Sequence, residues 1–401
     1  MTMRVSTLSR FEATVDSLQR RQGELARTQM QMTSGKRVNL PSDDPTAAAR
    51  IERSHTAQLR VASEQRSVDV SRNAMQLAES ALGQTGDVLH TAREVLVAAG
   101  NGTYSGGERA ALAEQLKQVR GQLLSLANQR DADGGFTFGG QGAISPPFLD
   151  AIGGIAFAGT PGQSQVSQNE QMPTSVDGQN IWLAARSGNG VFVTAAAAGN
   201  TGKGWIDAGG VSNPAALTGA NYDIVFSVNG LGATVYDVLK NGAPTAVLGA
   251  AYTAGTSITV DGQSFVVSGQ VAAGDQFSLT PSSPDLNPFE VLDRAIAVLQ
   301  NSNANTGQVA QAVSDGLRDM DAVMAHVQSG RSVAGSALSR LDSIDSRNQD
   351  RDLWAKSVQS DAEDLDMVKA VSEFQNQQSG YQAALQSYAM VQRMTLFDYI
   401  R

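Results

Sequence analysis

Cysteine and histidine, two residue types that often act in catalysis or bind metal ions, are absent or rare in this 401-residue chain. The chain contains no cysteine, which excludes disulfides, thiolate metal ligands and a thiol nucleophile. The three histidines, His55, His90 and His326, fall in segments with helical periodicity, and the first two are too far apart on one predicted helix to share a metal ion. We therefore interpret them as surface or helix-contact residues, and we predict no catalytic residue, no metal site and no cofactor.

Two acidic clusters are the remaining candidates for a cation site. Asp43 and Asp44 could bind calcium, but Asp44 followed by Pro45 is typical of a helix N-cap with proline at the first helical position. We predict that Asp43, Asp44 and Pro45 form an elbow between two helices. The helical register spreads the second cluster over several faces, which favours a solvated acidic face opposite the basic N-terminal segment. That cluster consists of Asp361, Glu363, Asp364 and Asp366.

One glycine-rich loop, Gly199–Gly204, loosely resembles a phosphate-binding loop. No serine or threonine follows Lys203 and no helical pattern follows the loop, so we interpret it as a mobile surface loop. Asn101-Gly102-Thr103 matches a glycosylation acceptor in form, but it is better explained as a turn between helices.

Composition excludes several classes of partner. A net charge of −9 and a sequence pI near 4.9 argue against nucleic acid or an anionic membrane. No run of 18 apolar residues is present, so we expect no membrane span. The N-terminus lacks the continuous apolar stretch of a secretory signal, so we do not expect cleavage of such a signal.

Both ends of the chain have the sequence pattern of helices that associate with another helix. Residues 1–34 and 365–396 each carry a narrow apolar stripe at helical spacing, which needs a partner helix because the other faces are polar. Residues 1–40 hold seven bases against three acids, and residues 350–401 hold eight acids against five bases, so the two ends are complementary. We name these apolar positions the assembly seam: Leu8, Phe11, Val15, Leu18, Leu25, Met32, Met367, Val371, Phe374, Tyr381, Leu385, Tyr388 and Val391.

Glutamines interrupt this assembly seam where a maximally stable coiled coil would have leucine. We interpret these polar positions as keeping the free monomer loose and as defining register against neighbours. They are Gln22, Gln29, Gln377 and Gln378.

Between the ends, the pattern predicts long helices. The first helix should end at Ser34-Gly35, and a helix of about 55 residues should begin at Pro45. Further helices are predicted over 107–130, from Pro288 to Gln300, and from about 306 to 361, the last with Gly330 and Gly335 as candidate break points. The long helix carries a seven-residue series: Val61, Val68, Met75, Leu82, Leu89 and Leu96.

Residues 139–285 differ from the rest. They hold more than half of the 40 glycines, and turn dipeptides such as Asn229-Gly230 and Asp261-Gly262 separate short β-branched and aromatic runs. The predicted fold is therefore mainly α with an inserted all-β domain, and both chain ends form a long antiparallel coiled-coil or helical-bundle rod. We expect residues 1–44 and 356–401 to form a terminal helical core domain. Residues 45–138 and 286–355 should form a long-helix bundle, and residues 139–285 an outer β-rich domain.

Four motifs resemble the bacterial flagellin superfamily: Met3–Thr7, Thr33–Asn39 with Ser42–Pro45, Phe136–Gly140 and Leu396–Ile400. True flagellins usually have alanine after the paired aspartates and end in a leucine-rich tail. Pro45 and the Leu-Phe-Asp-Tyr-Ile ending instead resemble the hook–filament junction members of the superfamily. The resemblance covers residues 1–140 and 285–401 well.

The resemblance implies a structural subunit of the bacterial flagellum, a hook-associated protein that connects the hook to the flagellin filament. It implies passage through the flagellar export channel and an extracellular location. The implied partners are further copies in a ring, a hook-associated protein on the hook side, flagellin on the filament side, and an export chaperone at the C-terminal helix. The assembly seam would lie in the inner core of a tube, and the elbow at Asp43, Asp44 and Pro45 would contact the next subunit.

Two alternatives stay open. The first is a flagellin that forms filaments by itself. The second is a secreted glycan-binding protein, which would need an aromatic platform on the β insert, whereas the candidate rings are dispersed along the sequence. These rings are Trp182, Trp205, Tyr222 and Tyr236.

Overall fold

The computed structural model describes residues 7–131, 134–141, 143–162 and 171–393, with side chains described only between residues 12 and 390. The chain divides into two units: residues 1–66 with 344–401, and residues 67–343. These two units do not coincide with the three domains expected from the sequence, whose boundaries remain a prediction. The motifs at residues 3–6 and 396–400 lie outside the described residues.

Seven α-helices are present in the described part of the chain, and all of them except α4 confirm a predicted helical region. Their bounds are α1 Thr7–Ser34, α2 Pro45–Ala99, α3 Gly106–Ala127, α4 Gly178–Leu183, α5 Pro288–Gln300, α6 Thr306–Glu363 and α7 Met367–Arg393. Helix α2 has the expected 55 residues. Helix α6 runs unbroken through Gly330 and Gly335, so neither candidate break point is a break. A β-carbon on Gly330 would lie 3.1 Å from Ile181, so this glycine makes room for α4.

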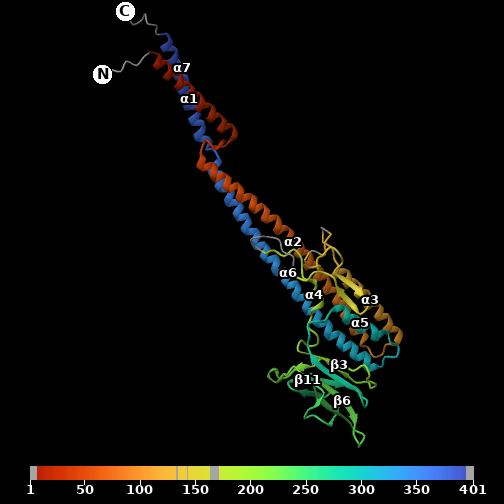
Figure 1. The fold of residues 1–401 in the computed structure, drawn as a ribbon. Coiled ribbons are helices and arrows are strands. Elements are labelled where there is room, and N and C mark those ends of the chain that lie inside the picture. Colours follow the sequence, from red (N-terminus) through yellow and green to blue (C-terminus); the bar gives the residue numbers. More distant parts are fainter. Residues whose placement is uncertain (1–6, 132–133, 142, 163–170, 394–401) are drawn as a thin grey trace, which may run out of the picture. The chain divides into compact units, whose positions relative to one another are not determined.

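In the first unit, α1 and α7 lie side by side (Figure 1). The first part of α2 and the last part of α6 are also joined by side chains. Gln58 Nε2 donates to Gln359 Oε1 at 2.6 Å, and Gln65 Nε2 donates to Asp345 Oδ1 at 2.8 Å. This unit is therefore built from helix pairs, each made from the two ends of the sequence.

In the second unit, the predicted seven-residue series of α2 forms much of the helical core. Met75, Leu82, Leu89 and Leu96 are all buried, as are Met320 and Val323 of α6. Helices α3 and α5 pack against each other, and each begins with a side-chain cap. Ser105 and Glu108 form a reciprocal capping box at α3, and Asn287 caps α5 with Pro288 at its first position.

A short hairpin and α4 complete this helical core with aromatic side chains. The hairpin pairs β1 (Phe148–Ala151) with β2 (Gly154–Phe157). The Trp182 ring of α4 lies 6.0 Å from the Phe289 ring of α5 and 5.7 Å from that of Phe138. The residues from 139 to about 186 were expected in the β insert, but this part packs its aromatic side chains on the helices.

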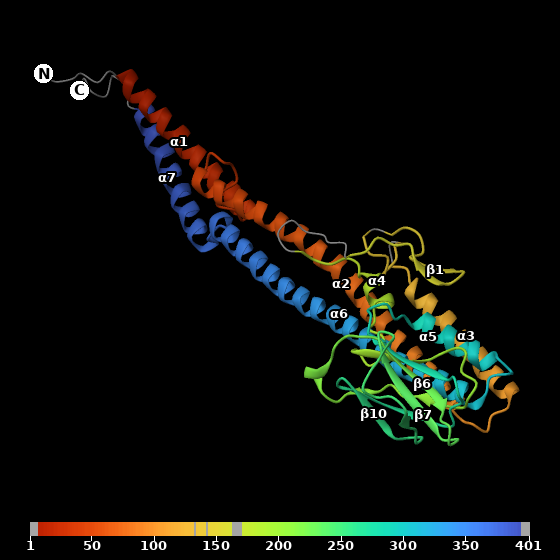
Figure 2. The same ribbon diagram turned by 60° about the horizontal axis from the view of Figure 1, so that its bottom comes forward.

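The remaining strands form a β-sandwich with its own apolar core (Figure 2). One sheet has the order β3-β12-β6-β7-β8, with β9 also paired to β7, and the other joins β10, β11, β4 and β5. Asp261 and Gly262 have φ of +42° and +81° at the β10–β11 turn, which confirms the predicted tight hairpin. The strands are β3 Phe192–Ala196, β4 Trp205–Ile206, β5 Gly210–Val211, β6 Tyr222–Val228, β7 Thr234–Lys240, β8 Ala243–Pro244, β9 Ala250–Ala251, β10 Ser257–Val260, β11 Gln263–Ser268 and β12 Gln276–Pro281.

The motif Phe136–Gly140 lies where two segments of backbone come close together. Phe136 and Phe138 are buried, and Gly140 has a φ of +72° and forms a bridge with Thr160. A β-carbon on Gly140 would lie 1.8 Å from the Thr160 carbonyl oxygen. Only glycine satisfies both the left-handed conformation and this contact.

This geometry predicts that Gly140→Ala strongly destabilises the second unit. Gly190→Ala is a matched control, because Gly190 also has a positive φ, of +86°, but no atom lies within 4 Å of an added β-carbon. We expect the control to lose about 1 kcal/mol of unfolding free energy, and Gly140→Ala to lose about 3 kcal/mol or more. Chemical denaturation followed by circular dichroism measures both, and equal losses would show that the contact with Thr160 is unimportant.

Candidate assembly site

The assembly seam occupies two adjacent faces of α7. Phe374, Tyr381 and Tyr388 are half-buried, whereas Met367, Val371 and Leu385 are 46%, 38% and 42% exposed. The more protected face continues through Ala370, Gln377 and Ala384 at helical spacing. One apolar stripe in the sequence therefore divides into a face that packs within the chain and a face that does not.

The α1 side of the assembly seam is half-buried throughout its described part. Its described members are Val15, Leu18, Leu25 and Met32. The side chains of Leu8, Phe11 and Val391 lie outside the described residues.

The α1–α7 contact also uses a polar residue and a glycine that sequence reasoning missed. Thr28 is only 6% exposed, and its hydroxyl lies 2.9 Å from Gln377 Oε1, to which it donates. A β-carbon on Gly380 would lie 2.7 Å from Arg21 Nη1, so the glycine accommodates that arginine. Of the four seam glutamines, Gln377 is half-buried and the other three are exposed. Thr28 lies between Leu25 and Met32 at helical spacing, which is the signal that could have identified it.

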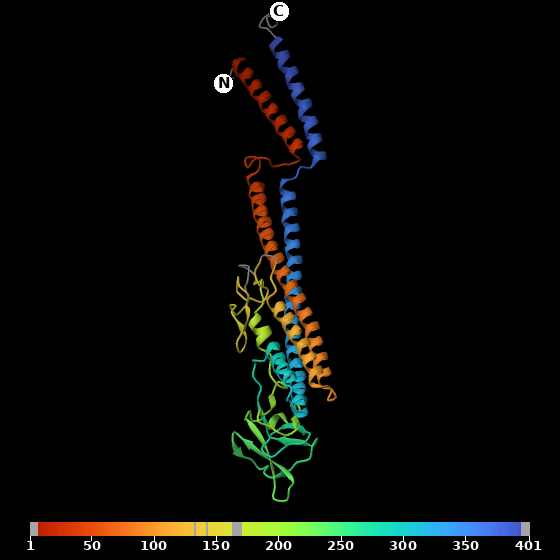
Figure 3. The ribbon, with the colours of Figure 1, turned by 90° about the vertical axis from the view of Figure 1, so that its right-hand side faces the viewer.

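The elbow joins the two ends of the chain through main-chain hydrogen bonds. Lys36 and Asp364 form an isolated antiparallel bridge, in which Arg37 N donates to Glu363 O at 2.7 Å and Leu365 N donates to Gly35 O at 3.0 Å. Gly35 has a φ of +69°, as expected of the residue that terminates α1. Figure 3 shows the two connecting segments, residues 35–44 and 364–366, between their helices.

The two aspartates of the elbow bind backbone N–H groups on either side of Pro45. Asp44 Oδ1 accepts from Ala47 N at 3.0 Å, which confirms the predicted N-cap of α2. Asp43 Oδ2 accepts from Leu40 N at 2.9 Å and from Asn39 N at 3.1 Å. These hydrogen bonds hold the pKa of each carboxyl group below its ordinary value.

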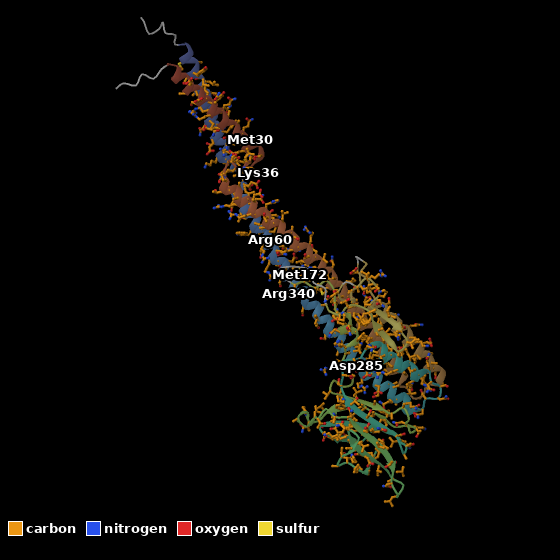
Figure 4. The ribbon with its side chains drawn as sticks, in the orientation of Figure 1. Met30, Lys36, Arg60, Met172, Asp285 and Arg340 are labelled. Atoms are coloured by element: carbon orange, nitrogen blue, oxygen red, sulfur yellow. The ribbon has the colours of Figure 1, made fainter. Side chains whose placement is uncertain are left out.

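Three cations complete the elbow. Arg37 Nη1 lies 3.0 Å from Asp44 Oδ2, and Arg37 Nη2 donates to the Ala362 carbonyl at 2.8 Å. Arg27 Nη2 lies 3.2 Å from Asp43 Oδ1. Lys36, labelled in Figure 4, pairs with Glu363, and this hydrogen bond raises the pKa of the lysine and lowers that of the glutamate. A small apolar cluster beneath them contains Val38, Ala47 and Ala362.

The sequence offered two other kinds of site, a metal site and a phosphate-binding loop. No group of three or more His, Asp and Glu side chains suited to a metal ion occurs among the described residues. In the loop Gly199–Gly204, the N–H groups of Thr201 and Gly202 donate to Asp275 Oδ1 at 2.9 and 3.2 Å, so an internal carboxylate takes the position a phosphate would need. None of the described helices combines the length and apolar character that a bilayer crossing requires.

The N-terminal third of the chain, residues 5–143, matches the bacterial flagellin N-terminal helical region. Over 400 residues the chain is 27% identical to flagellar hook-associated protein 3 of Salmonella typhimurium, with 99% of both chains covered. The crystal structure of flagellar hook-associated protein 3 from Legionella pneumophila superposes with a TM-score of 0.72 at 26% identity, over 77% of this chain and 97% of that one. Flagellin A of Vibrio cholerae is 30% identical over 158 residues, 38% of each chain. Similarity to the hook-associated protein thus spans the whole chain, and similarity to this flagellin covers less than half of it.

The elbow should loosen in acid. Asp43, Asp44 and Glu363 have folded pKa values below their ordinary ones, so their ionised forms stabilise the elbow above about pH 4, the range of unperturbed carboxyl groups, and this stabilisation is lost as the pH falls further. Amide exchange measured from pH 6 down to pH 2 and corrected for intrinsic rates should show protection of residues 35–48 falling below pH 4.

A variant and its control distinguish the charge of Asp44 from its role as the N-cap of α2. Asp44→Asn keeps an oxygen acceptor for Ala47 N but cannot titrate, so its protection at pH 6 should be only slightly reduced and should depend less on pH. Asp361→Asn is the control, because Asp361 is exposed and no described residue forms an ion pair with it. A protection profile of the unaltered chain that does not change with pH would contradict the role of the carboxylates.

Proposed function

We propose that this chain, which belongs to the bacterial flagellin superfamily, is the hook-associated structural subunit that connects the flagellar hook to the flagellin filament. The observation that carries the proposal is the correspondence with flagellar hook-associated protein 3 over 99% of the chain, whereas the match with the Vibrio flagellin covers 38% of it. Filament formation by the chain alone is the alternative, and it predicts that the purified protein polymerises into long filaments.

The assembly seam and the elbow are the parts we assign to assembly. Helices α1 and α7 pack through a narrow face, which leaves apolar side chains of both helices in solvent, among them Met30, Val368 and Met390 at 54%, 84% and 64% exposure. Burial of such side chains contributes roughly 1.5–3 kcal/mol each when a neighbour covers them. In the tube these faces meet other copies of the chain, the hook-associated neighbour on one side and flagellin on the other. Asp43, Asp44 and Pro45 orient the terminal helices and contact the next subunit.

The proposed role requires no catalysis. Of the four rings that a glycan platform would use, Trp182 and Tyr222 are buried, and Trp182 lies on α4, stacked on Phe289 of α5. The proposed location is extracellular, at the hook–filament junction, which the chain reaches through the flagellar export channel.

The deletion test compares the β-sandwich with the terminal helices. The sandwich can be removed cleanly, because Ser187 N donates to Ser283 O at 2.9 Å and the two ends of the insert therefore lie together. Replacing residues 188–282 by a short glycine linker should leave filaments on hooks. Deleting residues 2–20 or 382–401 should give bare hooks and flagellin released into the medium. Motile cells after either terminal deletion, with filament loss after the sandwich deletion, would reverse the assigned roles.

We further propose that an export chaperone binds the C-terminal helix before assembly. Phe374 is half-buried and Leu385 is 42% exposed, so an unassembled chain leaves part of both apolar side chains of α7 in solvent. Replacing both by aspartate should abolish co-purification with the chaperone, whereas Gln378→Asp and Gln382→Asp, at exposed polar positions, should leave it unchanged. Equal binding by both double variants would place the chaperone elsewhere.

A further inference from the structure

The part of the first unit formed by residues 51–66 of α2 and 344–361 of α6 is an antiparallel pair with a polar seam. Besides the two glutamine contacts, Glu64 Oε2 lies 3.5 Å from Arg351 Nη1. Apart from Ile344 at one end, the buried positions are small or polar, with Ser54 on α2, and Asn348 and Ala355 on α6. The contact between these helices therefore consumes little of their apolar surface.

Large apolar side chains lie on the outer sides of this pair instead. Leu59 is 59% exposed, Leu353 69% and Trp354 68%. Leu59 is two residues from half-buried Val61, and Leu353 is two residues from buried Ala355. Two residues correspond to about 200° around a helix, so both leucines face away from the seam that joins the helices. An exposed tryptophan beside an exposed leucine is the kind of anchor that protein interfaces use.

The charges around these residues are opposite on the two helices. On α2, Arg53 and Arg60 are exposed, and neither forms an ion pair within the described part of the chain. Arg60 is labelled on α2 in Figure 4. On α6, Asp350 and Asp361 are exposed and likewise make no ion pair with a described residue. Arg53 and Arg60 thus give α2 two bases without an ion partner among the described residues, and Asp350 and Asp361 give α6 two such acids beside Trp354.

The spacing of these groups also matches. Arg53 and Arg60 are seven residues apart, as are Trp354 and Asp361, which is about 10.5 Å along each helix. Because α2 and α6 run in opposite directions, α2 of one copy would run antiparallel to α6 of a second copy in the same orientation. In that arrangement Arg60 faces Trp354 when Arg53 faces Asp361.

We propose that the outer face of α2 in one copy of this chain packs against the outer face of α6 in the next copy. Leu59 meets Leu353, Arg60 stacks on Trp354, and Arg53 pairs with Asp361. The guanidinium over an indole ring is a favourable cation–π geometry. Because the two faces differ, the contact is heterologous and can be repeated from copy to copy around a ring. This inference rests on the proposed function as a ring-forming subunit, and it names the partner as a second copy by charge complementarity.

The absence of cysteine from the sequence allows a specific cross-linking test. The variant carrying Leu59→Cys and Leu353→Cys places its two thiols on opposite outer sides of the helix pair, where they cannot join within one copy. Flagella isolated from cells expressing it are oxidised and separated without reductant. We expect a ladder of dimers, trimers and larger species detected with an antibody against this chain.

Three controls define the contact. Each single-cysteine variant should remain monomeric, because a heterologous contact does not bring two copies of one position together. Leu59→Cys combined with Ser346→Cys should cross-link at least tenfold less, because position 346 is two turns from 353 on the same face. Dimers from a single variant would overturn the proposal in favour of a two-fold contact, and cross-links to a protein other than this chain would assign the face to a different partner.

A charge exchange provides a second readout. Arg53→Asp or Asp361→Arg alone should reduce the number of filaments attached per cell, and the two together in one chain should restore it. Absence of both the ladder and the rescue, in cells where the chain still localises to the hook–filament junction, would overturn the contact and leave the proposed function intact. Absence of the chain from that junction would instead contradict the proposed function.

Discussion

Two main-chain hydrogen bonds, Arg37 N to Glu363 O and Leu365 N to Gly35 O, determine how the two ends of the sequence are aligned in the first unit. Helices are stiff, so fixing the alignment at one point determines which side chains meet further along. Gln58 then meets Gln359, and Gln65 meets Asp345. If one helix slipped by a turn along the other, these side-chain amides would lose their partners in the contact between the helices. The free-energy cost of an unsatisfied polar group there exceeds the net stabilisation that one hydrogen bond provides.

The contact between α1 and α7 shows why the terminal helices retain accessible apolar surface. On its protected face, alanine, glycine and glutamine alternate with aromatic side chains that are only half-buried, so the helices approach closely but bury little hydrocarbon. Close approach at Gly380 and the hydroxyl of Thr28 give the pair a defined alignment. This alignment therefore leaves apolar side chains of both helices accessible.

The helix starts, the main-chain turns and the fold class could be predicted from the sequence, because they depend on local chemistry. Asp44 with Pro45, and Asn287 with Pro288, cap their helices through side chains only a few residues away. Asp261-Gly262 adopts the conformation that its dipeptide favours. The positions of the assembly seam follow from the same local chemistry, since they recur at helical spacing, and their role in assembly remains a prediction.

The parts that could not be predicted depend on contacts between distant segments. Whether glycine breaks a helix or makes room for another element is decided at Gly330 by Ile181, which lies far away in sequence. Similarly, periodicity places Val371 and Phe374 in one stripe, but only the position of α1 divides that stripe into two faces. The packing of the β1–β2 hairpin on α3 depends on Asn128, whose amide exchanges two hydrogen bonds with the Phe148 backbone at 2.8 and 2.9 Å.

The insert carrying the β-sandwich leaves and rejoins the helical part through neighbouring residues. Besides the bond from Ser187 to Ser283, Ala185 and Leu286 exchange backbone hydrogen bonds of 3.1 and 3.0 Å in each direction. Because the insert begins and ends at neighbouring points, a change in its size does not alter the distance between the helices to which it is attached. Evolution can therefore enlarge, exchange or shrink this module without redesigning the helices, and an engineer can use the same position to display a fluorescent reporter or an affinity tag.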